Sequence, residues 1–142
     1  MGTLKDANPN ARELVTEIID LTRWWSTLDL IVEFLQSKRV DTVRVEYGLV
    51  LDRDLSGKPQ AQSQTVQLVD LAEVIKKGFE DGTIEWAKTS DFLFYPLGAD
   101  LAFMLCNDAD VHFASSDLSL LMELGRTIRD SGLKVYDSGK LL

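Results

Sequence analysis

The stretch DFLFYPLGADLAFMLCNDADVHF, residues Asp91 to Phe113, is the part of the sequence that decides the fold. Its centre, Leu101 to Cys106, is the densest apolar run in the chain. A short apolar run bounded by turn residues is typical of a strand that is covered on both faces. Two more apolar runs, residues 92–95 and 111–114, flank it at short distances. Because short connections favour a meander, we predict a mainly antiparallel sheet with Asp100–Cys106 as its central strand.

Two further strands are predicted before this stretch. From Val40 onward apolar and polar side chains alternate, which indicates a strand with one buried face. The loop 52–59, DRDLSGKP, then leads into residues 60–68, QAQSQTVQL, which have too few apolar side chains for the middle of a sheet. We therefore place this Gln-rich strand at an edge. An uncharged edge is open to pairing with another chain, so a homodimer through it is one predicted form of partner binding.

Four helices are predicted. Apolar residues recur at helical spacing between residues 11 and 19, after a capping signal at Asn10, and a second helix is expected to begin at Ser26. A single kinked helix over residues 10–39 is the alternative to this N-terminal pair. A middle helix is expected from Asp70 to a glycine stop at Gly82, and a C-terminal helix follows Asp117. Short strands over residues 83–88 and 133–136 complete the prediction.

These elements predict a single α+β domain. The sheet should contain about five to seven short strands, with the N-terminal helix pair, one middle helix and one C-terminal helix packed on it. A length of 142 residues suits one domain of ordinary size. Residues 1–9 are polar and include Gly2 and Pro9, so we expect a flexible N-terminus followed by one domain over residues 10–142.

The composition favours a cytoplasmic protein with neither nucleic acid nor membrane as its partner. The chain has 23 acidic and 15 basic residues, a formal net charge of −8, and no cluster of basic residues that would attract a phosphate backbone. No apolar run approaches the roughly 20 residues that span a bilayer, and the N-terminus lacks the pattern of a signal peptide. The single cysteine, Cys106, excludes a disulfide within the chain.

The sharpest candidate for chemistry is the polar segment that follows the predicted central strand. In a continuous strand Cys106, Asp108, Asp110 and His112 would share one face, because side chains two residues apart point the same way. Two carboxylates and an imidazole could then bind a divalent metal or act as acid and base. The alternative is a turn at residues 107–109, which would remove Asp108 from that face.

The other candidate residues lie in two places. Trp24 and Trp25 would point about 100° apart on a helix, so one should be in the core and the other partly exposed, where a tryptophan can contact a partner. The loop carboxylates Asp52 and Asp54 could add to an acidic surface. The candidate residues for binding a partner are therefore Asp108, Asp110, His112, Asp52, Asp54, Trp24 and Trp25.

The sequence favours a binding protein over an enzyme. It contains no GxSxG, Walker loop, GxGxxG or HExxH motif, and Cys106 lies in an apolar run without a cationic neighbour. We therefore predict a non-enzymatic protein-interaction module, of the inhibitor or immunity type, that binds a basic partner through an acidic surface and needs no cofactor or metal. Two alternatives stay open: a small metal-dependent hydrolase that uses Asp108, Asp110 and His112, and a small-ligand binding protein.

Overall fold

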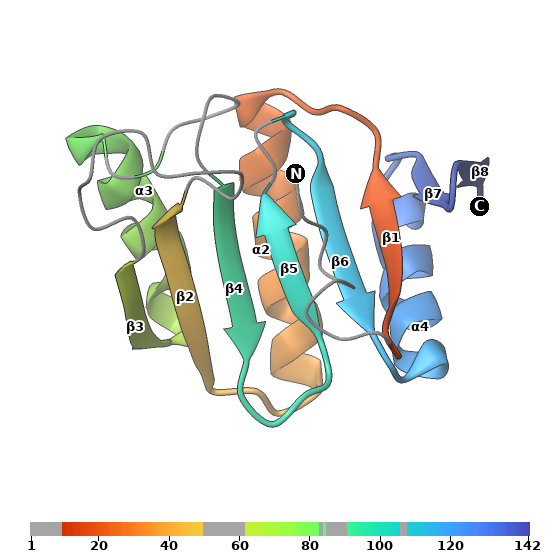
Figure 1. Cartoon of the computed structure of the whole chain (residues 1–142), viewed down its shortest axis with the longest axis horizontal. Helices are drawn as coiled ribbons and strands as arrows, with labels where there is room; N and C mark the ends of the chain where they lie inside the picture. Colours follow the sequence, from red (N-terminus) through yellow and green to blue (C-terminus); the bar gives the residue numbers. More distant parts are fainter. Residues whose placement is uncertain (1–9, 50–61, 83, 85–90, 106–107) are drawn as a thin grey trace.

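The chain forms an α+β domain. The computed structural model describes residues 10–49, 62–82, 84, 91–105 and 108–142, which form one eight-stranded sheet and three α-helices (Figure 1). In chain order the elements are β1 (Arg12–Thr16), α2 (Leu21–Ser37), β2 (Thr42–Leu49), β3 (Gln62–Gln67), the short 3₁₀ helix η1 (Leu68–Asp70), α3 (Leu71–Asp81), β4 (Asp91–Pro96), β5 (Ala102–Leu105), β6 (Val111–Ser115), α4 (Leu118–Asp130), β7 (Val135–Asp137) and β8 (Lys140–Leu141). No helix in this part of the chain is long and apolar enough to cross a membrane.

The sheet is antiparallel throughout, with the strand order β3-β2-β4-β5-β6-β1-β7-β8. β4, β5 and β6 form the predicted meander, and β5, from the apolar run, lies between the other two. β1 comes from the other end of the chain and lies between β6 and β7. Its Leu14 is opposite Phe113 on one side and Asp137 on the other. Residues 12–16 therefore form an interior strand of the sheet, and the predicted flexible N-terminus, residues 1–9, lies outside the described residues.

The predicted N-terminal helix pair is wrong. Residues 12–16 form β1, and one uninterrupted helix, α2, begins only at Leu21. The apolar residues between 11 and 19 fit a helical spacing, but side-chain burial in β1 alternates with a period of two. Leu14 and Thr16 are buried, while Glu13 and Val15 are less so. β-branched residues suit a strand, and pairing with strands on both sides outweighs the local helical pattern.

The start of α2 is set by Asp20. Its side chain accepts a hydrogen bond from the main-chain N–H of Arg23 at 2.7 Å, as an N-cap does. Ser26, the expected start of a second helix, instead donates its hydroxyl to the carbonyl of Arg23 at 2.9 Å within the helix. Thr27 does the same at 2.8 Å. Hydroxyls that bond back to the preceding turn are compatible with an unbroken helix.

The remaining differences concern the strand count. The expected number was about five to seven, and the described residues form eight because β1 and the two-residue β8 add to the sheet. The predicted strand over residues 83–88 lies, except for the buried Ile84, outside the described residues. The Gln-rich segment does form the edge strand β3, and the middle helix does end at Gly82, whose φ of 80° is left-handed.

The sheet has two unlike faces. α2 and α4 lie behind it in the view of Figure 1, and the face that they cover contributes the large aromatic side chains of the core. On that face the rings of Phe94 and Phe103 stack with centroids 4.6 Å apart. We call the opposite face the outer face; it carries only a small buried cluster, Leu93, Met104 and Ala114, with the partly buried Ala11, Tyr95 and Ala102 packed against it. Candidate chemistry is therefore expected on the outer face.

We predict that Phe103→Ala lowers the free energy of unfolding by about 3–5 kcal/mol, because the ring is fully buried and its removal leaves a cavity beside Phe94. Chemical denaturation monitored by circular dichroism measures the change. Leu97→Ala is the control, because Leu97 is 48% exposed in the turn after β4 and should change stability by no more than about 0.5 kcal/mol. Equal effects of the two substitutions would contradict the packing described.

Candidate functional site

The candidate site is centred on His112, which lies on the outer face between two carboxylates. Its Nδ1 is 3.2 Å from Oε2 of Glu13, and its Nε2 is 2.9 Å from Oδ1 of Asp110. All three side chains are largely buried, with exposed fractions of 13% for His112, 9% for Glu13 and 19% for Asp110. Both ring nitrogens are thus engaged by acidic groups from two different parts of the chain.

The sheet brings these groups together. Val15 on β1 is opposite His112 on β6, so Glu13, two residues earlier, is on the same face and diagonal to the imidazole. Asp110 precedes β6 and is two residues from His112, which puts its side chain on the same side. The spacing of Asp110 and His112 in the sequence therefore does correspond to a shared face, and Glu13 completes the cluster from a distant segment.

The two contacts define how many hydrogens the cluster needs. A neutral imidazole has one N–H donor and one acceptor nitrogen, whereas a carboxylate oxygen only accepts. Both contacts are satisfied when the ring of His112 carries hydrogens on both nitrogens and is positively charged. When the ring is protonated, both contacts are ion pairs as well as hydrogen bonds. The cluster then keeps one net negative charge.

A buried threonine compensates for the irregular backbone beside the cluster. Thr16, 2% exposed, accepts a hydrogen bond from the main-chain N–H of Val111 at 3.0 Å and donates to the carbonyl of Glu17 at 2.8 Å. Just before β6, Ala109 has a left-handed φ of 64°, and its carbonyl accepts from the N–H of Ile19 at 2.9 Å. These bonds fix the segment that carries Asp110 against the end of β1.

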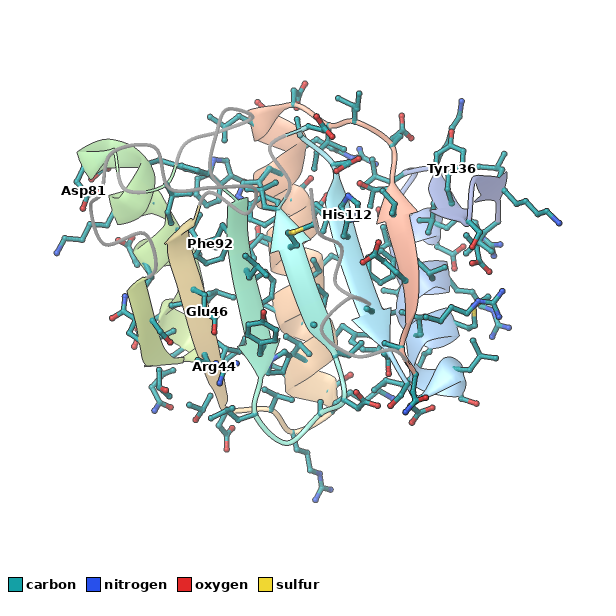
Figure 2. All side chains as sticks on the ribbon, viewed as in Figure 1. Arg44, Glu46, Asp81, Phe92, His112 and Tyr136 are labelled. Carbon is teal, nitrogen blue, oxygen red and sulfur yellow. The ribbon has the colours of Figure 1, made fainter. Side chains whose placement is uncertain are left out.

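A cleft of about 620 Å³ opens beside the cluster. It lies along the end of β1, between the segment before β6 and the β7–β8 hairpin. Figure 2 shows His112 and Tyr136 on the two sides of β1. Three carboxylates, one exposed isoleucine and one tyrosine are the chemically distinctive lining groups: Glu13, Glu17, Asp110, Ile18 and Tyr136. Acidic and apolar groups thus share one concave surface.

Other predicted site residues lie elsewhere. Asp108 is exposed in the turn before Ala109, so the turn interpretation of residues 107–109 describes its position better than a continuous strand does. Trp24 is fully buried, and Trp25 is partly buried with its ring edge-on to Phe79 at 5.8 Å. None of these three side chains lines the cleft. Cys106, Asp52 and Asp54 lie outside the described residues.

The arrangement gives little support to a metal centre. Among the described residues no group of three His, Cys, Asp or Glu side chains is placed to hold a metal ion. Glu13 and Asp110 contact different nitrogens of His112, so the ring lies between the two carboxylates and leaves no common point for a cation. Asp108 is exposed in the preceding turn.

Sequence reasoning missed Glu13, Glu17 and Tyr136. In the sequence, Glu13 fits the second half of the capping signal that begins at Asn10, because it follows Asn10 by three residues at the start of a helical pattern. The available signal was the alternation of Glu13, Val15 and Glu17 with Leu14 and Thr16, which is the period of a strand. Even that signal would not have identified β6 and β7 as the neighbours of this strand.

A second polar cluster lies on the outer face at β2 and β4. Arg44 is 3.4 Å from Glu46, and its guanidinium lies 4.8 Å from the ring centre of Tyr95 (Figure 2 labels Arg44 and Glu46). Burial raises the pKa of Tyr95 above its ordinary value of 10.0, and the negative charge of Glu46 raises it further. Arg44 already contacts both Glu46 and Tyr95, and none of these three residues lines the cleft beside His112. This cluster is therefore a weaker candidate for ligand binding than that cleft.

Comparisons of the chain with protein-family models, with curated proteins and with solved structures find no match. The fold and the chemistry of the cleft are therefore the basis for assigning a function.

We predict that both ring nitrogens of His112 carry hydrogens at neutral pH. Nitrogen-15 NMR of the imidazole measures this directly, and the signals need no assignment because the chain has one histidine. In Asp110→Asn the amide can donate to Nε2, so a neutral ring with its hydrogen on Nδ1 becomes favourable. A neutral ring in the unchanged protein, with Glu13 and Asp110 both ionised, would contradict the geometry.

We also predict that Tyr95 stays protonated to a higher pH in the folded protein than in the unfolded chain. Because its folded pKa is raised, its contribution to stability is fully present below about pH 10 and is lost as the pH rises through the folded value. The difference in ultraviolet absorbance between the protein and Tyr95→Phe isolates this phenol during an alkaline titration. Glu46→Gln should lower the midpoint, and an unchanged midpoint would exclude the influence of Glu46.

Proposed function

We propose that the protein is a non-enzymatic interaction module of the inhibitor or immunity type, which binds a basic protein partner through the acidic cleft. The observation that carries this proposal is that three carboxylates line a cleft of about 620 Å³ together with Ile18, an isoleucine that is 73% exposed. An apolar anchor next to acidic groups suits a protein surface that presents a lysine or arginine among apolar residues.

The charge of the cleft favours a cation. Glu13, Glu17 and Asp110 bring three carboxylates to the lining, and His112 beside the cleft offsets one of their charges when its ring is protonated. The whole chain, these carboxylates included, has a formal net charge of −8 with His112 counted as neutral, which attracts a basic partner over longer distances and raises the rate of encounter. A guanidinium group would suit the site particularly well, because its planar set of donors can bond two carboxylates at once.

The apolar groups supply the second requirement of a protein interface. Ile18 and Tyr136 line the cleft, and Leu141 on the neighbouring strand β8 is 61% exposed. Covering side chains of this kind contributes most of the binding energy in protein complexes, while surrounding charges mainly set partner choice. Acidic groups without such anchors would bind counterions weakly and with little selectivity.

The state of His112 supports binding over catalysis. A general base needs a nitrogen that can accept a proton from a substrate. Here Glu13 and Asp110 each engage one nitrogen of the ring, at 3.2 and 2.9 Å. His112 therefore suits the role of holding the two carboxylates in place along the cleft.

A small cationic ligand is the second candidate, because about 620 Å³ lies within the range of roughly 300–1,000 Å³ of small-molecule sites. Spermidine is a suitable probe, since its ammonium groups match the carboxylates. A rise in melting temperature with spermidine that is lost in Glu17→Gln/Asp110→Asn would favour this candidate. If the partner is a protein instead, spermidine should raise the melting temperature only slightly. The control variant Asp29→Asn/Glu33→Gln, described below, should then show the same small rise.

We predict that a cleft variant, Glu17→Gln/Asp110→Asn, loses at least tenfold in affinity for the basic partner. The immobilised protein should retain proteins of high isoelectric point from an extract of its source cell at low salt and release them at high salt. Partners identified by mass spectrometry are then purified and measured by calorimetry against each variant.

The matched control is Asp29→Asn/Glu33→Gln, which removes two charges from exposed positions of α2. It has the same net charge as the cleft variant, so it separates the cleft from the overall field. Equal affinity of the two variants for the purified partner, or no partner that discriminates between them, would refute the proposal. Melting curves of both variants confirm that the fold is retained.

A further inference from the structure

The two edges of the sheet differ in how they are protected. β8, at one edge, has two residues, and one of them is Lys140. Short edge strands and lysines are the usual means by which proteins prevent edge-to-edge pairing. β3, at the other edge, has six residues, QSQTVQ, without a charge or a proline. In a chain of which 27% of residues are charged, β3 is the edge that, among the described residues, carries neither a charge nor a proline.

The hydrogen bonds show which main-chain groups of β3 point away from the sheet. The N–H of Leu68 donates to the carbonyl of Asp41 at 2.8 Å, so these two residues face each other across the β2–β3 ladder. The main-chain N–H and C=O groups of successive residues point to alternate sides of a strand, so those of residues 66 and 64 also point toward β2. The N–H groups of Ser63, Thr65 and Gln67 therefore point outward, and all three residues are exposed.

We propose that β3 pairs with β3 of a second copy of this chain, forming a two-fold dimer with a continuous antiparallel sheet. In such a dimer identical groups approach one another, so charges of one sign on the strand would repel. The outward residues are all neutral. The nearest charges on the outer face, Arg44 opposite Thr65 and Glu46 opposite Ser63, already form an ion pair with each other.

The symmetric register has Thr65 at its centre. With Thr65 opposite its own copy, Ser63 of one chain lies opposite Gln67 of the other, and the reverse pairing follows by symmetry. Cross-strand pairs of threonines are favourable in antiparallel sheets, and the two copies of Thr65 form such a pair at the two-fold axis. The main-chain N–H groups of the three outward residues find acceptors in the same register.

A second copy fits this edge better than a charged peptide, because β3 has no charged side chain that could pair with one. The dimer also closes by itself. β8 cannot continue the sheet in the same way, so pairing at β3 stops at two chains and forms no filament. The proposal does not depend on the function of the cleft, which lies at the other end of the sheet.

Sedimentation velocity over protein concentrations from about 10 to about 500 µM tests this inference. We expect a species of twice the 15.9 kDa chain mass, and we expect higher salt to strengthen it, because two copies of net charge −8 repel at long range. Binding of a basic partner in the cleft has the opposite salt dependence, so failure of one proposal is distinguishable from failure of the other.

Two edge variants and a control locate the contact. Thr65→Pro removes an outward N–H without touching the bonds to β2, and Thr65→Lys adds a charge at the two-fold axis. Each should weaken the dimer at least tenfold, while Thr22→Lys, an equal charge change at an exposed position of α2, should leave it intact. A monomer at every concentration and salt, or a dimer that persists in the folded Thr65→Lys variant, would overturn the inference.

Discussion

The insertion of β1 between β6 and β7 is the constraint on which the rest of this structure depends. Without β1 the meander β4-β5-β6 and the C-terminal hairpin would have no shared strand. On burial, the main chain of β1 gives up its hydrogen bonds with water, and the ladders with β6 and β7 replace them. Without these ladders several buried N–H and C=O groups would be unpaired, which is unfavourable. Leu14 meanwhile becomes part of the hydrophobic core, and Thr16 is buried beside it.

The same insertion creates the candidate site. β1 is short, and the chain leaves the sheet at Glu17, whose main-chain N–H donates to the carbonyl of Lys134 at 2.9 Å. The carboxylate of Glu17 accepts from the N–H of Lys134 at 2.6 Å. These two bonds join the end of β1 to the residue before β7, and the next residue, Ile18, is 73% exposed. A site of this kind results from joining distant segments, and its acidic groups come from both of them.

The sequence was most informative where local pattern and tertiary environment agree. The apolar run at Leu101–Leu105 indicated a strand inside the sheet, the polar run before Leu68 indicated an edge, and Gly82 indicated a helix end. The N-terminal segment was misread because its side chains satisfy both a period of 3.6 and a period of two. Only the presence of β6 and β7 on either side decides between them, and that information is not local.

The candidate site was predictable only in part for the same reason. Asp110 and His112 are two residues apart, so their shared face could be inferred from spacing alone. Glu13 contacts His112 although the two are 99 residues apart in the sequence, and no local sequence pattern predicts such a contact. Asp108 leaves the cluster because Ala109 adopts a left-handed conformation, an uncommon state for a residue with a side chain, fixed here by its carbonyl bond to Ile19.

The distance between the acidic cleft and the neutral edge has a consequence for how both surfaces could operate. β1 and β3 are five strand positions apart, which corresponds to roughly 24 Å at the usual spacing of about 4.8 Å. That distance exceeds the screening length of about 8 Å at physiological ionic strength, so a cation bound at the cleft has little electrostatic effect on the edge. Pairing at β3 would therefore leave one cleft near each outer end of a continuous sheet. Two sites held at a fixed separation bind a partner that presents two basic groups far more tightly than either site alone, provided that the spacing matches.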